Sequence, residues 1–260
     1  MATAVLALAR LGARCAYAGA VGADRESELP LAPLRRAGVD CTRVKQLAAG
    51  RTRRALIRID PESGEREVLA ERDPGVGLSP ADLDRGLIES AAVLLVDAED
   101  PEASAWAAGV AGEAGVAVVL DADRAGEGVE ALLSLVDFPI VSHEFAESLG
   151  DGSALQALRV LAMRARHLAV VTLGTGGAIA MARDGDRVLE SPAFRVEARD
   201  TTGAGDVFHA GFIWGLLQGF DVSAVLRAAN AAAAMSCRAL GAQAGLPDRE
   251  ELVAFLAGAD

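Results

Sequence analysis

Short apolar runs and helical patterns follow one another along most of the chain, and their order predicts the architecture. From residue 79 onward the apolar runs have the length of buried strands; they lie at 92–96, 116–121, 138–141 and 168–172. Residues 79–90 and 102–114 carry helical signals, the first opened by a capping serine and a proline. Apolar strands separated by helices are typical of a parallel sheet that helices cover on both faces.

The first part of the chain has a different pattern, with shorter strands and more glycine. Residues 2–12 predict an amphipathic helix, followed by a strand at 15–18, a turn at 19–24 and a short helix at 29–38. Alternation over 53–60, a turn at 61–64 and a returning strand at 65–71 predict a hairpin with one apolar face. Because two strands alone are only marginally stable, this face is expected to cover a site or to pair with another chain.

The last part of the chain is mostly helical. A glycine-rich loop at 173–177 precedes a predicted hairpin at 178–181 and 187–190, and helices are predicted at 204–217, at 222–240 and after Pro247. The spacing of Gly211 and Gly215 imitates a membrane dimer motif, but His209 and Gln218 interrupt the apolar stretch. The helix at 204–217 is therefore predicted to be a buried core helix.

Residues 200–206, D-T-T-G-A-G-D, carry the strongest chemical signal. Gly203 and Gly205 lack a Cβ atom, so successive backbone N–H groups can approach an anion at the start of the helix that follows. A carboxylate does not help to bind an anion, so its presence here indicates a chemical role: Asp206 could accept a proton from an attacking hydroxyl. The alternative is an ordinary cap and turn, with Asp206 merely favouring the first helical turn.

This stretch resembles the second signature of the ribokinase-like (PfkB) carbohydrate kinases, D-T-x-G-A-G-D, at every defined position. The resemblance implies an α/β, ribokinase-like three-layer α/β/α fold with a mainly parallel central sheet and a small β lid. It also implies that Gly203, Ala204 and Gly205 form the anion hole for the transferred phosphate and that Asp206 is the catalytic base. The hairpin at about 51–72, called the lid hairpin below, would then cover the sugar and form a homodimer contact.

The N-terminal part is similar to the same kinases through L-A-R-L-G at 8–12 and G-x-V-G-x-D at 19–24. The family places this segment near the sugar, which implies sugar contacts for Gly22 and Asp24. Ligands of open α/β sheets gather beyond the carboxyl ends of the strands, where Asp97, Asp121 and Asp123 lie. These carboxylates are candidates for sugar hydroxyls or a metal ion, and we assign Asp97 and Asp123 to the sugar; solvated loop carboxylates are the alternative.

The resemblance further implies a nucleotide site. Thr172, Gly174 and Gly177 match the family's T-x-G-x-x-G segment and are expected to contact ATP, while Asn230 and Gly241 would border the adenine pocket. The carbonyls around Asp200, Thr202 and Gly241 could hold a monovalent cation such as K⁺.

The family's metal motif is changed in this chain. Where the family usually has N-x-x-E, Ser142 and Phe145 replace the two defined residues. Glu144 or Glu147 could substitute, and Glu144 is the candidate for Mg²⁺, although a carboxylate at a helix start needs no such role. His143 is expected to be a surface or capping residue.

Composition narrows the function classes. The formal net charge of -12 argues against nucleic-acid binding, and Arg51, Arg53 and Arg54 form the only tight basic cluster. No uncharged apolar run reaches transmembrane length, so neither a membrane nor a nucleic-acid partner is expected. The 3 cysteines are scattered, which suits a reducing cytoplasm.

We interpret residues 1–260 as a single kinase domain that phosphorylates a sugar hydroxyl with ATP and Mg²⁺. A nucleoside kinase and a non-catalytic nucleotide-binding regulator are the alternatives. The family normally has, before the first helix, a strand with a sugar-binding Asp and a Gly-Gly-x-x-x-N motif. Neither is present here, which suggests a truncated or misassigned start, or else a degenerate relative, and makes the activity of this form an open question.

Overall fold

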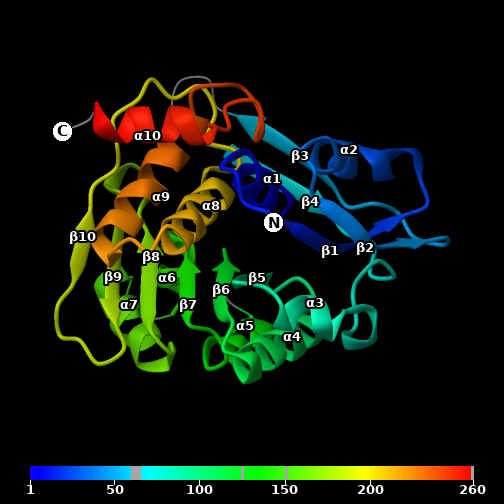
Figure 1. Cartoon of the computed structure of the whole chain (residues 1–260), viewed down its shortest axis with the longest axis horizontal. Coiled ribbons are helices and arrows are strands. Elements are labelled where there is room, and N and C mark those ends of the chain that lie inside the picture. The colour runs from blue at the N-terminus through cyan, green and yellow to red at the C-terminus, as the bar shows by residue number, and fades with distance from the viewer. Residues whose placement is uncertain (60–65, 124–125, 150–151, 259–260) are drawn as a thin grey trace.

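The computed structural model describes residues 1–59, 66–123, 126–149 and 152–258, and the hairpin turn expected at 61–64 lies outside them. Figure 1 shows a large sheet between helices and a smaller group of strands beside it. The helices are α1 (Ala2–Arg10), α2 (Glu28–Arg36), α3 (Arg85–Glu89), α4 (Pro101–Ala114), α5 (Glu127–Leu133), α6 (His143–Ser148), α7 (Ala154–Arg164), α8 (Ala204–Leu217), α9 (Val222–Ser236) and α10 (Arg249–Ala257). The strands are β1 (Ala16–Gly22), β2 (Asp40–Leu47), β3 (Arg54–Ile59), β4 (Arg66–Glu71), β5 (Val93–Asp97), β6 (Ala117–Ala122), β7 (Phe138–Val141), β8 (Leu168–Thr172), β9 (Ala178–Ala182) and β10 (Leu189–Ser191).

The large sheet confirms the prediction of a mainly parallel sheet. Its six strands lie in the order β10-β9-β8-β7-β6-β5, with β5 to β8 parallel and β9 and β10 antiparallel. Asp97 and Asp121 are paired in the register of β5 and β6, so two carboxylates leave the sheet side by side. The carboxyl ends of the parallel strands face α8 (Figure 1).

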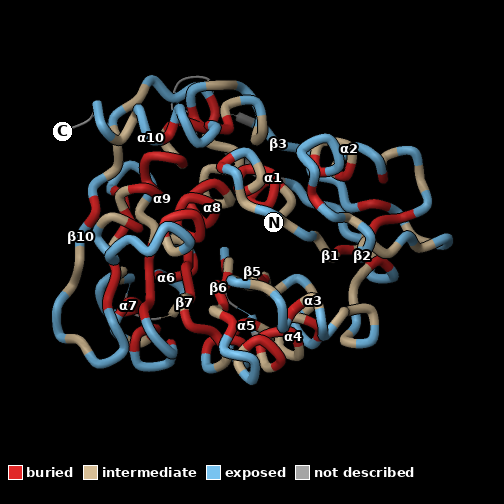
Figure 2. Tube along the Cα trace, viewed as in Figure 1, coloured by how far each residue is buried: buried red, intermediate tan, exposed pale blue. Residues whose placement is uncertain are grey.

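Helices cover both faces of this sheet, as a three-layer α/β/α fold requires. Val119, Ile140 and Val170 belong to a buried cluster that includes α1, α8 and α9. The alternate residues Val118 and Val171 belong to a second cluster, with α4, α5, α6 and α7. Figure 2 shows the buried residues concentrated in the central strands and in α8. The apolar strand runs are explained by this burial, because both faces of each strand are dry.

The pair α8 and α9 packs closely because their contact surface is made of small residues. A Cβ added at Gly211 would lie 2.8 Å from the Cα of Ala229, and one at Gly215 would lie 3.1 Å from the Cα of Val225. The glycine spacing therefore serves packing inside the protein, as predicted. Among the described residues, no helix has both the length and the apolar character needed to cross a bilayer.

The smaller group of strands departs from the sequence predictions. The turn expected at 19–24 is wrong up to Gly22, because β1 continues to that residue and pairs in parallel with β2, which was not expected. Gly22 is a packing position: a Cβ there would lie 2.2 Å from the carbonyl oxygen of Gly50. Two helices of the main layer, α5 and α7, were also not expected.

The lid hairpin, β3 and β4, forms as predicted but does not have one apolar face. Leu56 and Leu69 are cross-strand partners and are 68% and 58% exposed, whereas Ile57 lies on the other face and is 38% exposed. Apolar residues therefore occupy both faces of the hairpin. The long helix expected at 222–240 is also shorter, ending at Ser236, because the next carbonyl, that of Cys237, accepts hydrogen bonds from another loop.

Candidate active site

The start of α8 is the centre of the candidate site. Gly203 is the residue before the helix, with φ of 78°, a left-handed conformation that favours glycine, and a Cβ there would lie 2.9 Å from the Cβ of Ala242. Asp206 lies in the first helical turn. The N–H groups of this turn have no partner inside the helix, and the helix dipole adds partial positive charge. The loop can thus receive an anion beside a carboxylate.

Asp200 holds this loop in place. Its side chain is 3% exposed and accepts hydrogen bonds from the N–H of Thr202 at 2.8 Å and from the N–H of Gly241 at 2.7 Å. The N–H of Arg199 donates to the carbonyl of Cys237 at 2.8 Å, which ties the same two segments again. The loop before α8 and the loop after α9 are therefore tied together by several hydrogen bonds.

The loop leaves space where an anion would need it. A Cβ added at Gly205 would meet nothing within 4 Å, in contrast to Gly203. Nearby in the chain, the hydroxyl of Thr202 is buried without a hydrogen-bond partner among the described residues. A buried hydroxyl of this kind is costly unless something binds it. Both observations fit a phosphate or an ion held at this loop.

Carboxylates line the sheet edge opposite the loop. Burial raises the pKa of Asp97, and burial raises the pKa of Asp121 to about 6, with Asp123 and Asp206 adding to the effect on Asp121. Nε2 of His209 in α8 lies 3.6 Å from Oδ1 of Asp121, so α8 and the end of β6 meet in one region, where the charge of Asp206 also favours protonation of Asp121. The structure therefore joins the Asp206 loop to two of the strand-end carboxylates selected from sequence.

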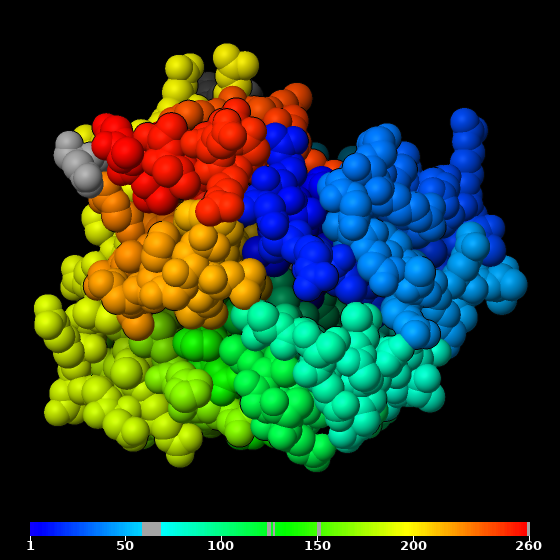
Figure 3. Space-filling view, viewed as in Figure 1, coloured from blue at the N-terminus to red at the C-terminus, as the bar shows by residue number. Residues whose placement is uncertain are grey.

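The α-amino nitrogen of Met1 lies in the same region, 2.5 Å from Oδ1 of Asp206. Burial alone would lower the pKa of this amine, but the charges of Asp206, Asp121 and Asp97 outweigh burial and raise the pKa to about 10. Three carboxylates from three elements thus act on one point. Figure 3 shows the N-terminal residues, in dark blue, against α8, in orange.

Two residues of this region were not identified from sequence. Tyr17 of β1 has its pKa raised to about 12, first by burial and then by the charges of Asp97 and Asp206. His209 of α8 is 3% exposed; its Nδ1 lies 2.7 Å from the carbonyl oxygen of Gly205, and its Nε2 lies 3.6 Å from Oδ1 of Asp121. The available signal for His209 was its position one helical turn after Asp206, on the same face.

Of the residues assigned to ATP, Thr172, Gly174 and Gly177 lie at the carboxyl end of β8 and in the loop after it. Thr172 ends β8 and donates from its hydroxyl to the carbonyl of Val141 at 3.4 Å. Gly174 and Gly241 have positive φ and are exposed. Gly177 is buried, and a Cβ there would lie 2.1 Å from the carbonyl oxygen of Ser191.

Asn230 is buried in α9 and anchors β10. Its amide nitrogen donates to the carbonyl oxygen of Ser191 at 3.0 Å and to the Ser191 hydroxyl at 2.9 Å. This structural task explains a polar residue in an alanine-rich helix. The adenine contact predicted for Asn230 stays a prediction.

Gly22 and Asp24 meet at the base of the lid hairpin. The N–H of Gly22 donates to the Thr52 hydroxyl at 3.1 Å, and Asp24 accepts from the Thr52 hydroxyl and N–H, each at 2.6 Å. These hydrogen bonds from Thr52 are the main reason why the pKa of Asp24 is lowered. The carboxylate of Asp24 thus fixes the connection into β3.

The changed metal motif has a structural explanation. Ser142 caps α6 by accepting from the N–H of Phe145 at 3.1 Å, and the Phe145 side chain is 1% exposed within the core. Glu144 is exposed in the first turn, and His143 is exposed, as expected, and pairs with Glu147.

Asp123 is exposed beside the start of α6, where its backbone carbonyl accepts a hydrogen bond from the Ser142 hydroxyl. Within the described ranges, no three acidic, His or Cys side chains form a metal cluster.

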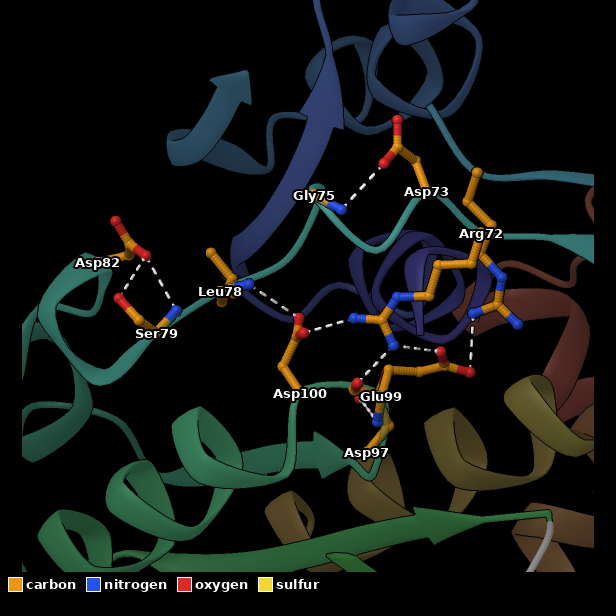
Figure 4. Close-up of polar contacts among 10 residues, drawn as sticks. Arg72, Asp73, Gly75, Leu78, Ser79, Asp82, Asp97, Glu99 and Asp100 are labelled. Carbon is orange, nitrogen blue, oxygen red and sulfur yellow. Dashed lines mark hydrogen bonds and ion pairs between the residues drawn. The ribbon is translucent and has the colours of Figure 1, made fainter. Parts of the chain in front are cut away.

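The lid hairpin is fastened to the sheet edge by ion pairs (Figure 4). Arg53, before β3, lies 2.8 Å from one carboxylate oxygen of Glu99, and Arg72, after β4, lies 3.0 Å from the other. Arg72 also pairs with Asp100, and the N–H of Glu99 donates to Asp97 at 3.0 Å. Both ends of the hairpin are therefore held by the loop that follows β5, next to a strand-end carboxylate.

Comparison with known proteins agrees with this geometry. The family model described as pfkB family carbohydrate kinase matches residues 2–249. A ribokinase from Haemophilus influenzae is 30% identical, with 98% of this chain and 85% of the relative aligned. An ATP-dependent ribose-1-phosphate kinase from Halopiger xanaduensis is 31% identical over 98% of this chain and 84% of its own. The crystal structure of a putative ribokinase from Agrobacterium tumefaciens superimposes with a TM-score of 0.92 at 29% identity, covering 99% of this chain and 85% of that one, which confirms the ribokinase-like fold.

Proposed function

Because this chain belongs to the pfkB family of carbohydrate kinases, we propose that it transfers the terminal phosphate of ATP to a hydroxyl of a sugar or sugar derivative, with Asp206 as general base. The observation that carries the proposal is the start of α8, where open space at Gly205 adjoins a carboxylate in the first turn. An anion and a hydroxyl could meet there. Phosphoryl transfer needs little more from a protein than positioning and charge stabilisation.

In this mechanism the Asp206 carboxylate accepts the proton of the attacking hydroxyl, and the N–H groups of residues 203–205 stabilise the negative charge that develops on the phosphate. Asp97 and Asp123 would orient the sugar by accepting hydrogen bonds from its other hydroxyls, with Gly22 and Asp24 at the base of the lid hairpin. Ionised carboxylates only accept hydrogen bonds, so they suit a substrate with several hydroxyl groups that donate them.

Thr172, Gly174, Gly177, Asn230 and Gly241 would hold ATP. Mg²⁺, which neutralises charge on the phosphate oxygens, is usually bound through one or two carboxylates plus the substrate phosphates. Glu144 is the residue we assign to it. Asp200 and Thr202 would lie beside a monovalent cation such as K⁺, and the buried Thr202 hydroxyl without a described partner supports a ligand there.

The first test replaces Asp206 by asparagine, which keeps the loop and its N–H groups but removes the base. Sugar-dependent ATP consumption should fall by about 10²- to 10⁴-fold while ATP binding and thermal stability stay near wild type. A panel of pentoses, hexoses, sugar phosphates and nucleosides names the acceptor and separates the sugar kinase from the nucleoside kinase.

Glu102→Gln is the control, because it removes a carboxylate from the first turn of α4 instead. A variant at Asp206 that keeps more than about a tenth of the wild-type turnover would contradict the role of general base. ATP binding without turnover on any acceptor would favour a nucleotide-binding regulator.

The lid hairpin supports a second part of the proposal, a homodimer. Leu56 and Leu69 form an exposed apolar pair on one face, and Ile57, less exposed, lies on the other. We expect Leu56→Glu to shift the protein toward monomer and Ile57→Glu to raise the KM for the sugar several-fold, since the proposed dimer contact and the closed lid would each bury the added charge. Light scattering and kinetics measure the two effects. If neither variant changes oligomeric state or KM, the hairpin is no lid.

A further inference from the structure

His209 and Asp121 form a buried pair beside the transfer site that the proposed mechanism does not use. Their side chains are 4% and 13% exposed, and Nε2 of His209 lies 3.6 Å from Oδ1 of Asp121. This nitrogen has no hydrogen-bond partner among the described residues. A buried polar atom directed at a carboxyl group indicates a charge interaction, because burial without any partner would be costly.

The hydrogen bond on the other side of the ring fixes where the protons are. Nδ1 of His209 lies 2.7 Å from the carbonyl oxygen of Gly205. A carbonyl oxygen only accepts, so Nδ1 carries a hydrogen and donates it. Nε2 then faces the Asp121 carboxyl group at 3.6 Å, which is too long for a hydrogen bond, so the two side chains interact through charge.

The pair lies close to the proposed base, so its charge interaction acts on the transfer site. Gly205 belongs to residues 200–206, called the anion loop below, and directly precedes Asp206, while Asp121 is the penultimate residue of β6 and interacts electrostatically with Asp206 and Asp123. Burial raises the pKa of Asp121 to about 6, and the His209 charge opposes that rise. The α-amino group of Met1 also acts on Asp121. Without His209, the carboxyl groups of Asp121 and Asp206 would lose one compensating charge.

We propose that His209 is a positioning residue of the transfer site: it holds the Gly205 carbonyl through Nδ1 and, through the charge interaction of Nε2 with Asp121, offsets negative charge beside Asp206. This inference rests on the proposed kinase function. It assigns His209 no contact with substrate; the residue acts on the geometry of the loop and on the charge around Asp206.

The kinetic test compares the pH dependence of kcat/KM in His209→Asn, Asp121→Asn and the double variant. Asparagine keeps a short donor for the Gly205 carbonyl but has no atom at the position of Nε2. In His209→Asn, the carboxyl groups beside the loop lose a compensating charge, which favours their protonated forms, so the acid limb should move to higher pH by about one unit, with a loss of about tenfold at neutral pH. The double variant should return the limb toward wild type, and the two losses should not add.

His167→Asn is the matched control. Nε2 of His167 also lies 3.6 Å from an aspartate, Asp137, but the His167 side chain is 69% exposed. His167 directly precedes β8, so it lies at the amino end of that strand, whereas the candidate site lies at the carboxyl ends. This variant should leave the pH profile unchanged. A His209→Asn profile of wild-type shape, with losses that add to those of Asp121→Asn, would overturn the proposal and leave His209 as a packing residue.

A measurement without turnover separates this inference from the kinase function. The chain has 3 histidines, so ¹⁵N signals of the His209 imidazole are assigned by their loss in His209→Asn. We expect Nδ1 to stay protonated throughout, and the Nε2 signal to change its titration in Asp121→Asn. Unchanged Nε2 signals in Asp121→Asn would refute the pair even in an active kinase. A protein inactive on every acceptor would refute the kinase proposal, while the imidazole signals would still decide on the pair.

Discussion

The layered sheet and the lid hairpin are held by different forces. Leu158 of α7 and Phe212 of α8 are 0% exposed within the two apolar clusters. In the lid hairpin, every side chain from Arg54 to Arg58 is exposed. The hairpin is fastened instead by ion pairs whose partners are 25% to 52% exposed. Burial of apolar groups stabilises far more than exposed ion pairs, which contribute about 0.2–1 kcal/mol each.

This difference suits the chemistry that each region would perform. The anion loop lies on the buried helix α8 and is tied by Asp200, so its N–H groups are positioned before any ligand binds. The lid hairpin has weak connections, so it can change position at a small cost in free energy. A rigid transfer loop and a movable cover are what a kinase that must exclude water requires.

The largest effect that tests this comparison is on stability. Leu158→Ala should lower the free energy of unfolding by about 2–5 kcal/mol, because it leaves a cavity among fully buried side chains. Leu56→Ala makes the same chemical change in the lid hairpin, where the side chain is 68% exposed, and should change stability by less than about 0.5 kcal/mol. Urea denaturation measures both, and similar losses would show that the lid hairpin belongs to the same cooperative core.

A smaller effect distinguishes the anion loop from the rest of the rigid region. Gly205→Ala adds a methyl group to open space at the helix start, so stability should be unchanged or rise by up to about 1 kcal/mol. Turnover should fall by about 10- to 100-fold, since the methyl group displaces the phosphate. Gly109→Ala is the control, because it also adds a methyl group to open space, within α4. Equal activity of the two variants would mean that no phosphate binds at Gly205.

The smallest expected effect concerns the ion pairs of the lid hairpin. Glu99→Gln weakens the ion pairs of residue 99 with Arg53 and Arg72, which fasten the two ends of the lid hairpin. It should raise the KM for the sugar by about two- to fivefold, with kcat and stability nearly unchanged. The difference from wild type should shrink in 1 M salt, where exposed charges are screened. Glu113→Gln removes another exposed ion pair, with Arg85, and serves as control. A KM that is insensitive to both charge and salt would show that the hairpin is fastened by something else.

Much of the fold could be predicted because its signals are local. The apolar runs of β5, β6, β7 and β8 reveal their burial directly, and the buried helix α8 was correctly placed. The missed elements had weaker patterns. The strand β1 contains Gly19 and Gly22, which read as a turn, but their missing side chains make room for neighbouring groups that sequence does not show.

The candidate site divides in the same way. Residues 200–206 lie in one stretch, so their spacing alone predicts an anion loop followed by a carboxylate, and the family assignment they suggested is confirmed. Other contacts of the site join segments that are far apart in the chain. They are the hydrogen bond from Gly241 to Asp200, the ion pairs of Arg53 and Arg72 with Glu99, and the pair of His209 with Asp121. Local periodicity carries no information on such contacts. The sequence therefore determined the chemistry of the loop, whereas only the packing of α8 against the sheet edge decided which distant charges act on it.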